Sequence, residues 1–245
     1  MAQTVLYIYA MTNDSGFAPC VDDGWFTLAC CKGGVKGGMR KKVAEDYNTE
    51  GNNVYVLGLC GKGLANGNEA MIFSPIYLAK IDDVIEMKDY YKKTEEKGSW
   101  KNKRANKRTD DVYSISSNDN LEPTKCNPHN EEDIKKDIGG RYVLCSRRFT
   151  YWGDACGTKN ENDIEDSFPD LFARIRKRTR FRGYMVDRDF SEFEKEIDKW
   201  NWFPQEGDQP NIISKDSINK KLYVSKYDND DEEIVFCGNC GGKRK

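Results

Sequence analysis

Residues 4–10 read TVLYIYA, and this stretch decides the fold class. Its β-branched and aromatic side chains predict a buried strand. A turn-rich segment follows, and residues 25–31, WFTLACC, predict a second extended or short helical segment. Further along the chain, apolar runs predict three more strands, at residues 54–59, 70–81 and 141–145, the middle one with an edge, bulge or break at Pro75.

Helical patterns alternate with these strands. Residues 40–46 and 82–91 predict helices, and Phe168, Leu171, Phe172 and Ile175 recur at the spacing of one apolar helix face. A second apolar stripe predicts a helix over residues 190–200. We therefore expect an α+β fold, with a twisted or barrel-like mixed β-sheet flanked by helices.

The length of 245 residues fits a single elaborated domain spanning residues 1–245. Residues 1–91 and 139–205 carry the apolar patterns and form the predicted core. Residues 92–138 are dominated by Lys, Asn, Asp, Glu and Ser, which predicts a polar surface excursion. Residues 206–245 form a C-terminal extension.

Composition narrows the functional classes. The net charge of −2 excludes bulk electrostatic attraction to nucleic acid or anionic membranes, so any such contact needs a local basic patch. The sequence begins without a signal-peptide pattern and has no long apolar run, which predicts a cytoplasmic protein that does not enter a membrane. The nine cysteines are then expected to be reduced thiols or metal ligands.

The single histidine, His129, lies in a polar stretch and is expected to be a solvent-exposed loop residue. One histidine also argues against a Ser-His-Asp triad, a Cys-His dyad or a multi-histidine metal site.

The segment from Asp14 to Lys32 is the first candidate site. Gly16 and Pro19 favour a tight loop directly after a buried strand, where sites are commonly built. Cys31 and Lys32 then present a thiol and an ammonium side by side. An acid, a thiol and a lysine suit binding of a base edge and a phosphate, or acid-base and nucleophilic chemistry. The plainer interpretation is a turn aspartate and small core cysteines.

Two further segments suit phosphate binding. In Gly61-Lys62-Gly63 the glycines allow close backbone approach and the lysine adds charge, although a plain hairpin or bulge is equally compatible. A basic run near the end of the predicted 168–175 helix is the best candidate for contacting phosphates, the alternative being a solvated helix end. Its members are Arg174, Arg176, Lys177, Arg178 and Arg180.

Cys237 and Cys240 have the CxxC spacing of half a zinc site. Nothing in the sequence selects the other half, so a structural zinc ion and a pair of reduced thiols both remain open.

The N-terminal arrangement resembles the nucleotide modification associated domain families, the second and third types in particular. The resemblance is carried by the opening strand, by the DSGFAP segment that ends at Pro19, and by residues 26–32, FTLACCK. It implies a place in phage or bacterial systems that modify, read or attack nucleic-acid bases. By analogy of fold, the layout is also similar to small PUA-like barrels that hold a flipped or modified base.

The leading hypothesis is a protein that binds a nucleotide or a nucleic-acid base, linked to base modification or antiphage defence, with possible partner proteins from such systems. In it, Asp14, Gly16, Pro19, Cys31 and Lys32 line the site. Residues 61–63 close one side, and the basic run holds phosphates. One alternative is an enzyme that modifies or cleaves a nucleotide with Asp14, Cys31 and Lys32. Another is a small-nucleotide sensor or sponge in phage–host conflict.

Overall fold

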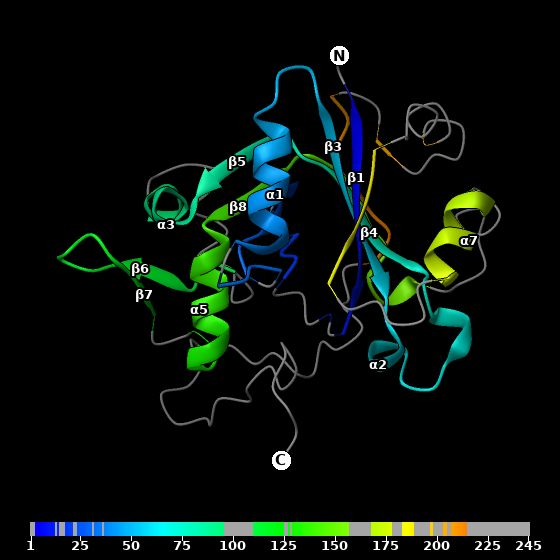
Figure 1. The fold of residues 1–245 in the computed structure, drawn as a ribbon, viewed down its shortest axis with the longest axis horizontal. Helices are drawn as coiled ribbons and strands as arrows, with labels where there is room; N and C mark the ends of the chain where they lie inside the picture. The colour runs from blue at the N-terminus through cyan, green and yellow to red at the C-terminus, as the bar shows by residue number, and fades with distance from the viewer. Residues whose placement is uncertain are drawn as a thin grey trace. The chain divides into compact units, whose positions relative to one another are not determined.

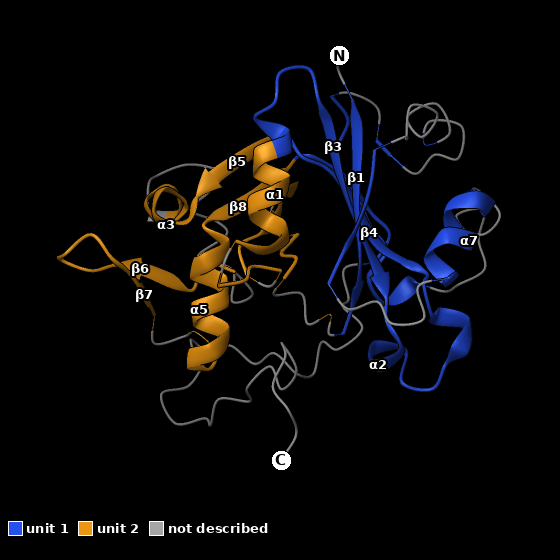
Figure 2. Ribbon diagram, viewed as in Figure 1, with its two compact units in different colours: residues 1–12, 46–82, 147–218 blue, residues 13–45, 83–146, 219–245 orange. Residues whose placement is uncertain are grey.

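The structure is a computed structural model, and it is drawn in Figure 1. It describes residues 3–12, 14, 18–21, 24–30, 32–35, 37–95, 110–124, 127, 129–156, 168–177, 183–188, 197, 203–204 and 207–214. The chain divides into two compact units, each assembled from separate stretches of sequence (Figure 2). Unit 1 contains residues 1–12, 46–82 and 147–218, and unit 2 contains residues 13–45, 83–146 and 219–245.

Unit 1 is built on a six-stranded mixed sheet with the strand order β10-β1-β3-β4-β9-β11. Its strands are β1 (Thr4–Met11), β3 (Asn53–Cys60), β4 (Pro75–Lys80), β9 (Arg148–Tyr151), β10 (Met185–Asp187) and β11 (Asn211–Ile212). β1 and β3 are parallel along their whole length, from Thr4 opposite Asn53 to Met11 opposite Cys60. Both strands are buried from their second residue onward, which explains why their sequences are almost continuously apolar.

Gly58 in the middle of β3 makes room for a pair of tyrosines. A Cβ atom at this position would lie 2.3 Å from the Tyr77 ring and 2.9 Å from Sδ of Met11. The Tyr77 hydroxyl donates a hydrogen bond to the Tyr9 hydroxyl at 2.6 Å. The glycine is therefore required by side-chain packing across three neighbouring strands.

The expected strand over residues 70–81 is shorter in the structure. Glu69–Met71 form a short 3-10 helix (η2), and β4 begins only at Pro75. Pro75 has no N–H to donate to the sheet, and the pairing with β3 shifts register between Gly58 and Leu59, opposite this end of β4. The break expected at Pro75 is thus confirmed, while the strand assignment before it is wrong.

The helical elements of unit 1 are short. They are α2 (Lys62–Ala65), η2, η3 (Gly153–Ala155) and α7 (Pro169–Lys177). In α7 Leu171 and Ile175 are buried, so the apolar face predicted from their spacing is confirmed.

Polar contacts fix the β10 edge of the sheet. Arg188, directly after β10, and the Tyr7 hydroxyl of β1 both donate hydrogen bonds to the carboxylate of Asp46.

The described residues of unit 2 form a three-stranded antiparallel sheet, a hairpin and three helices. The sheet has the order β2-β8-β5. The elements are β2 (Phe26–Leu28), α1 (Gly38–Tyr47), β5 (Asp83–Glu86), α3 (Met87–Glu95), β6 (Tyr113–Ile115), β7 (Leu121–Pro123), α5 (Glu131–Gly140) and β8 (Tyr142–Ser146). The last two residues of α1 are counted in unit 1. The core of unit 2 is a cluster of side chains from β5, α3, β8, the residues that follow β2 and the start of β6.

A close backbone contact holds the loop before α1 against α5. The Gly34 amide donates to the Lys136 carbonyl at 2.8 Å. A Cβ atom on Gly33 would lie 2.0 Å from that same carbonyl oxygen, and one on Gly139 would lie 2.4 Å from the Gly34 oxygen. The glycine-rich stretch therefore serves as a packing surface, since any side chain would push the two segments apart.

The α+β class is confirmed. The strand orders of the described sheets have free ends, so the described residues form open sheets and no closed barrel. None of the helices in the described ranges is long and apolar enough to cross a membrane. Apart from Ile197, the expected helix over residues 190–200 lies outside the described residues, as do residues 215–245 of the C-terminal extension.

The predicted surface excursion over residues 92–138 needs correction in its described part. Residues 110–113 and 129 are buried, and Val112 and Tyr113 belong to the core of unit 2. Some of its described polar residues, such as Asp110, His129 and Asp137, are buried hydrogen-bonding groups, which composition alone does not distinguish from a solvated loop.

Candidate functional site

The residues expected from the first motif lie in unit 2. Asp14 is 1% exposed and Pro19 is buried. Lys32 is half-buried, with a φ of 48°, and its carbonyl accepts hydrogen bonds from the amides of Met39 and Arg40 at 2.9 and 3.3 Å. Lys32 therefore ends the motif at the point where α1 begins. Gly16 and Cys31 lie outside the described residues.

The glycine–lysine segment lies in unit 1, where β3 leads into α2. The Gly61 amide donates to the Met11 carbonyl at 3.0 Å, and a Cβ atom on Gly61 would lie 2.5 Å from that oxygen. Lys62 and Gly63 are exposed. Gly61 thus joins two strand ends, and Lys62 remains the group in this segment that can reach a phosphate.

The described basic residues of the arginine run are exposed on α7. Arg174 forms an ion pair with Asp187 at the end of β10, and the guanidinium of Arg176 lies 5.6 Å from the centre of the Phe172 ring. Lys177 is exposed at the end of the helix. Arg178 and Arg180, and the cysteine pair Cys237 and Cys240, lie outside the described residues.

A buried carboxylate holds the end of β2 in unit 2. Oδ1 of Asp110 accepts hydrogen bonds from the Thr27 hydroxyl at 3.1 Å and the Tyr90 hydroxyl at 2.8 Å, and Oδ2 accepts one from the Ala29 amide at 3.0 Å. Burial, and next the charge of Asp110, raise the pKa of Tyr90 well above its ordinary value. Tyr90 therefore stays a neutral donor at physiological pH, and the backbone of residues 27–29 is fixed by side-chain contacts.

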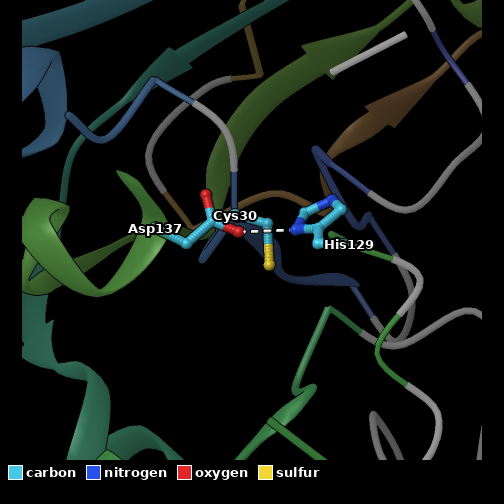
Figure 3. A group of neighbouring side chains, drawn as sticks. All are labelled: Cys30, His129 and Asp137. Atoms are coloured by element: carbon cyan, nitrogen blue, oxygen red, sulfur yellow. Dashed lines mark hydrogen bonds and ion pairs between the residues drawn. The ribbon is translucent and has the colours of Figure 1, made fainter. Parts of the chain in front are cut away.

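Cys30, directly after this anchor, joins the single histidine and an aspartate (Figure 3). One ligand-type atom from each of Cys30, His129 and Asp137 lies within 4.8 Å of the others. Nδ1 of His129 lies 2.6 Å from Oδ2 of Asp137, and the Tyr113 hydroxyl donates to the same oxygen at 2.9 Å. The Cys30 thiol also donates to the main-chain oxygen of Asp110 at 3.6 Å.

A fully buried arginine completes this cluster. Arg40 of α1 donates through Nη1 to the Tyr142 carbonyl at 2.6 Å and through Nη2 to the Asp137 carbonyl at 2.5 Å. Burial by itself would raise the pKa of the Asp137 carboxyl, but the His129 hydrogen bond and the Arg40 charge outweigh it and lower that pKa. Asp137 is therefore a buried carboxylate that stays ionised at neutral pH.

These contacts correct the interpretation of His129. Its side chain is 1% exposed, so the expected solvent-exposed loop residue is wrong. His129 also lies close to Cys30. A chain with one histidine can therefore still carry thiol–imidazole chemistry. The sequence does contain a signal, because Cys126 and His129 have the CxxH spacing typical of metal ligands. Cys126 itself lies outside the described residues.

In the comparison with family models, the model of nucleotide modification associated domain 2 matches residues 3–216. The chain therefore belongs to the nucleotide modification associated domain 2 family, as its N-terminal motifs indicated. No curated protein and no solved structure significantly matches the chain. The family name connects the chain with nucleotide modification systems.

Proposed function

We propose that the chain binds a nucleotide or a base of a nucleic acid, and that the binding site in unit 2 is the segment from Asp14 to Lys32. Membership of the nucleotide modification associated family supports a ligand of this class. The observation that carries the proposal is the anchoring of residues 27–29 on Asp110, because a fixed backbone followed by a thiol and a half-buried lysine is a pre-organised polar site.

In this proposal the residues have different tasks. Asp14 and Pro19, with Gly16 and Cys31, shape the base site, and Lys32 supplies positive charge at its rim. In unit 1, Lys62, flanked by Gly61 and Gly63, and the exposed basic residues of α7 supply separate phosphate contacts. Phosphate contacts of this kind would add affinity without selecting a sequence, whereas contacts in the base site would select the base.

The test for the base site compares Lys32→Gln with Lys88→Gln, an exposed lysine of α3 in the same unit. Binding of labelled DNA and RNA oligonucleotides, with and without modified bases, is measured by fluorescence anisotropy. A hydrogen bond to a charged group contributes about 1.5–3 kcal/mol, so K32Q should weaken binding roughly tenfold or more. Equal affinity of the two variants for every oligonucleotide contradicts the assignment.

The test for the phosphate contacts uses Arg176→Gln on α7. Each phosphate contact that is lost should lower the slope of log affinity against log salt by about one. R176Q should therefore weaken binding by a similar factor for all sequences, whereas a base-site variant should change the preference among them. An unchanged salt slope excludes Arg176 from the phosphate contacts.

The second candidate is an enzyme that modifies or cleaves a nucleotide or base. In the sequence, Asp14, Cys31 and Lys32 suggest such an enzyme. The observation that favours it is the buried cluster of the Cys30 thiol, the His129 imidazole and the Asp137 carboxylate. Nucleoside mass spectrometry after incubation with DNA, RNA and free nucleotides tests it directly. An altered nucleoside that disappears in Cys30→Ser supports this candidate, and the absence of any product with or without divalent metals contradicts it.

A further inference from the structure

We infer that Cys30, His129 and Asp137 form a binding site for one divalent transition-metal ion of the zinc class. The inference is separate from the proposed base-binding function, which stands or falls on oligonucleotide binding. It also differs from the zinc half-site expected at Cys237 and Cys240, because it uses three residues of unit 2 that the structure brings together.

The donor set is the first argument. A thiolate, an imidazole and a carboxylate are the three ligand types that zinc accepts, and the sulfur and nitrogen donors disfavour magnesium and calcium. Zinc–ligand bonds of about 2.0–2.3 Å place neighbouring ligand atoms of a tetrahedral site about 3.5 Å apart. The present separations of at most 4.8 Å require only small side-chain adjustments to reach such an arrangement.

The way in which the three residues are held is the second argument. They come from separate segments: Cys30 follows β2, His129 precedes α5 and Asp137 lies within α5. Asp110 fixes the backbone beside Cys30, while Tyr113 donates to the Asp137 carboxylate. Outer hydrogen bonds of this kind orient the ligands of metal sites.

The charge balance is the third argument. Zinc binds a deprotonated thiol, a neutral imidazole and a carboxylate, so the Cys30 thiol releases its proton and the thiolate and the Asp137 carboxylate together neutralise the dication. Arg40 does not prevent this, because its guanidinium is anchored on two main-chain carbonyls and lies 4.0 Å from Oδ1 of Asp137. Among the described residues three ligand groups converge, out of the four that a tetrahedral zinc ion takes.

The alternative is a buried hydrogen-bonded cluster that binds no ion. NMR of the single histidine distinguishes a metal site from such a cluster, because any imidazole resonance of a chain without a histidine tag reports on this site alone. The full chain, stripped with a chelator, is titrated with Zn²⁺ and followed by nitrogen-15 NMR of the imidazole. A coordination shift of the His129 ring that saturates at one equivalent is expected, and unchanged His129 resonances at saturation overturn the inference.

Variants then assign the remaining ligands, in a Cys237→Ser/Cys240→Ser background that removes the other candidate zinc ligands. Co²⁺ titration should give a thiolate charge-transfer band that is lost in Cys30→Ser and retained in Cys145→Ser, a buried thiol of the same core. Asp137→Asn should weaken Zn²⁺ binding at least tenfold. A band that persists in C30S overturns the assignment. If D137N fails to fold, the NMR titration of the wild-type chain still decides whether His129 binds zinc.

Discussion

Arg40 on α1 reaches Asp137 on α5 through the main chain more closely than through the carboxylate. Nη2 of Arg40 donates to the Asp137 carbonyl at 2.5 Å, whereas the nearest carboxylate oxygen is 4.0 Å away. Nη1 donates to the Tyr142 carbonyl at the start of β8. A guanidinium with no exposed surface thus ties α1 to both sides of the α5–β8 connection.

Replacement of Arg40 by Met should be strongly destabilising. It removes the donor to two buried carbonyls and the positive charge beside the Asp137 carboxylate, and breaking a buried ion pair in this way costs about 3–5 kcal/mol. Urea unfolding followed by circular dichroism measures the change. Arg141→Met is the control, because Arg141 pairs with Glu86 on the exposed surface and should change the midpoint little. Equal midpoints for the two variants would show that the buried guanidinium is dispensable.

The glycines before α1 lead to a second prediction. Gly33→Ala would place a Cβ atom 2.0 Å from the Lys136 carbonyl, so the loop and α5 have to move apart. Overpacking of this kind costs about 1–3 kcal/mol. Gly63→Ala is the matched control, since a Cβ atom there meets nothing within 4 Å. Thermal and urea unfolding should show a loss of stability for G33A and not for G63A. A similar loss of stability in G63A would refute the packing argument.

The strands, but not the buried polar cluster, were predictable from the sequence. β1, β3 and β8 are apolar runs whose burial follows from composition over a few residues. Asp110 and His129 lie in a polar segment, and their burial depends on partners such as Thr27 and Asp137 that are distant in sequence. A local pattern carries no information about such long-range pairings, so composition favoured a solvated loop.

The motif from Asp14 to Lys32 also combines features that the sequence predicts with contacts that it does not. Its strand and its role as a turn into α1 follow from residue types at local spacing. The sequence emphasised Cys31 beside Lys32, whereas the described contacts centre on Cys30, one residue earlier. Local residue types do not decide which of two neighbouring thiols joins the buried cluster, because the partners of Cys30, His129 and Asp137, are distant in sequence.

Asp82 in unit 1 predicts a pH dependence of stability. Its pKa is raised above 3.8, mainly by partial desolvation of the carboxyl group in an otherwise exposed residue, although hydrogen bonds from the amides of Arg147 and Arg148 oppose the shift. A raised carboxyl pKa stabilises the folded state below the unfolded pKa, and this contribution is lost as pH rises through the folded pKa. Asp82→Asn keeps an oxygen acceptor but cannot ionise. Wild-type stability, measured by urea unfolding, should therefore fall relative to D82N between pH 3 and pH 7, from roughly one unit below to roughly three units above the ordinary carboxyl pKa. A stability difference between wild type and D82N that stays constant, or that grows in favour of the wild type as pH rises, would contradict the raised pKa of Asp82.

The last prediction concerns Asp110, which anchors the end of β2. An alanine side chain has no acceptor, so the Ala29 amide and the hydroxyls of Thr27 and Tyr90 all lose the partner that the carboxylate provides. Asp110→Ala should cost about 1–3 kcal/mol. Tyr90→Phe removes only one donor and should cost about 0.5–1.5 kcal/mol.

Amide hydrogen exchange distinguishes loss of this anchor from a general loss of stability. In D110A the Ala29 amide loses its carboxylate acceptor and should exchange faster than the neighbouring β2 and β8 amides, even after correction for global unfolding. In Y90F the Ala29 bond is retained, so exchange at Ala29 should change only as much as at its neighbours. If Ala29 stays equally protected in D110A, the carboxylate does not hold this backbone. The position of Cys30 beside His129 must then depend on other contacts, such as the β2–β8 pairing and the hydrogen bond from the thiol to the Asp110 main chain.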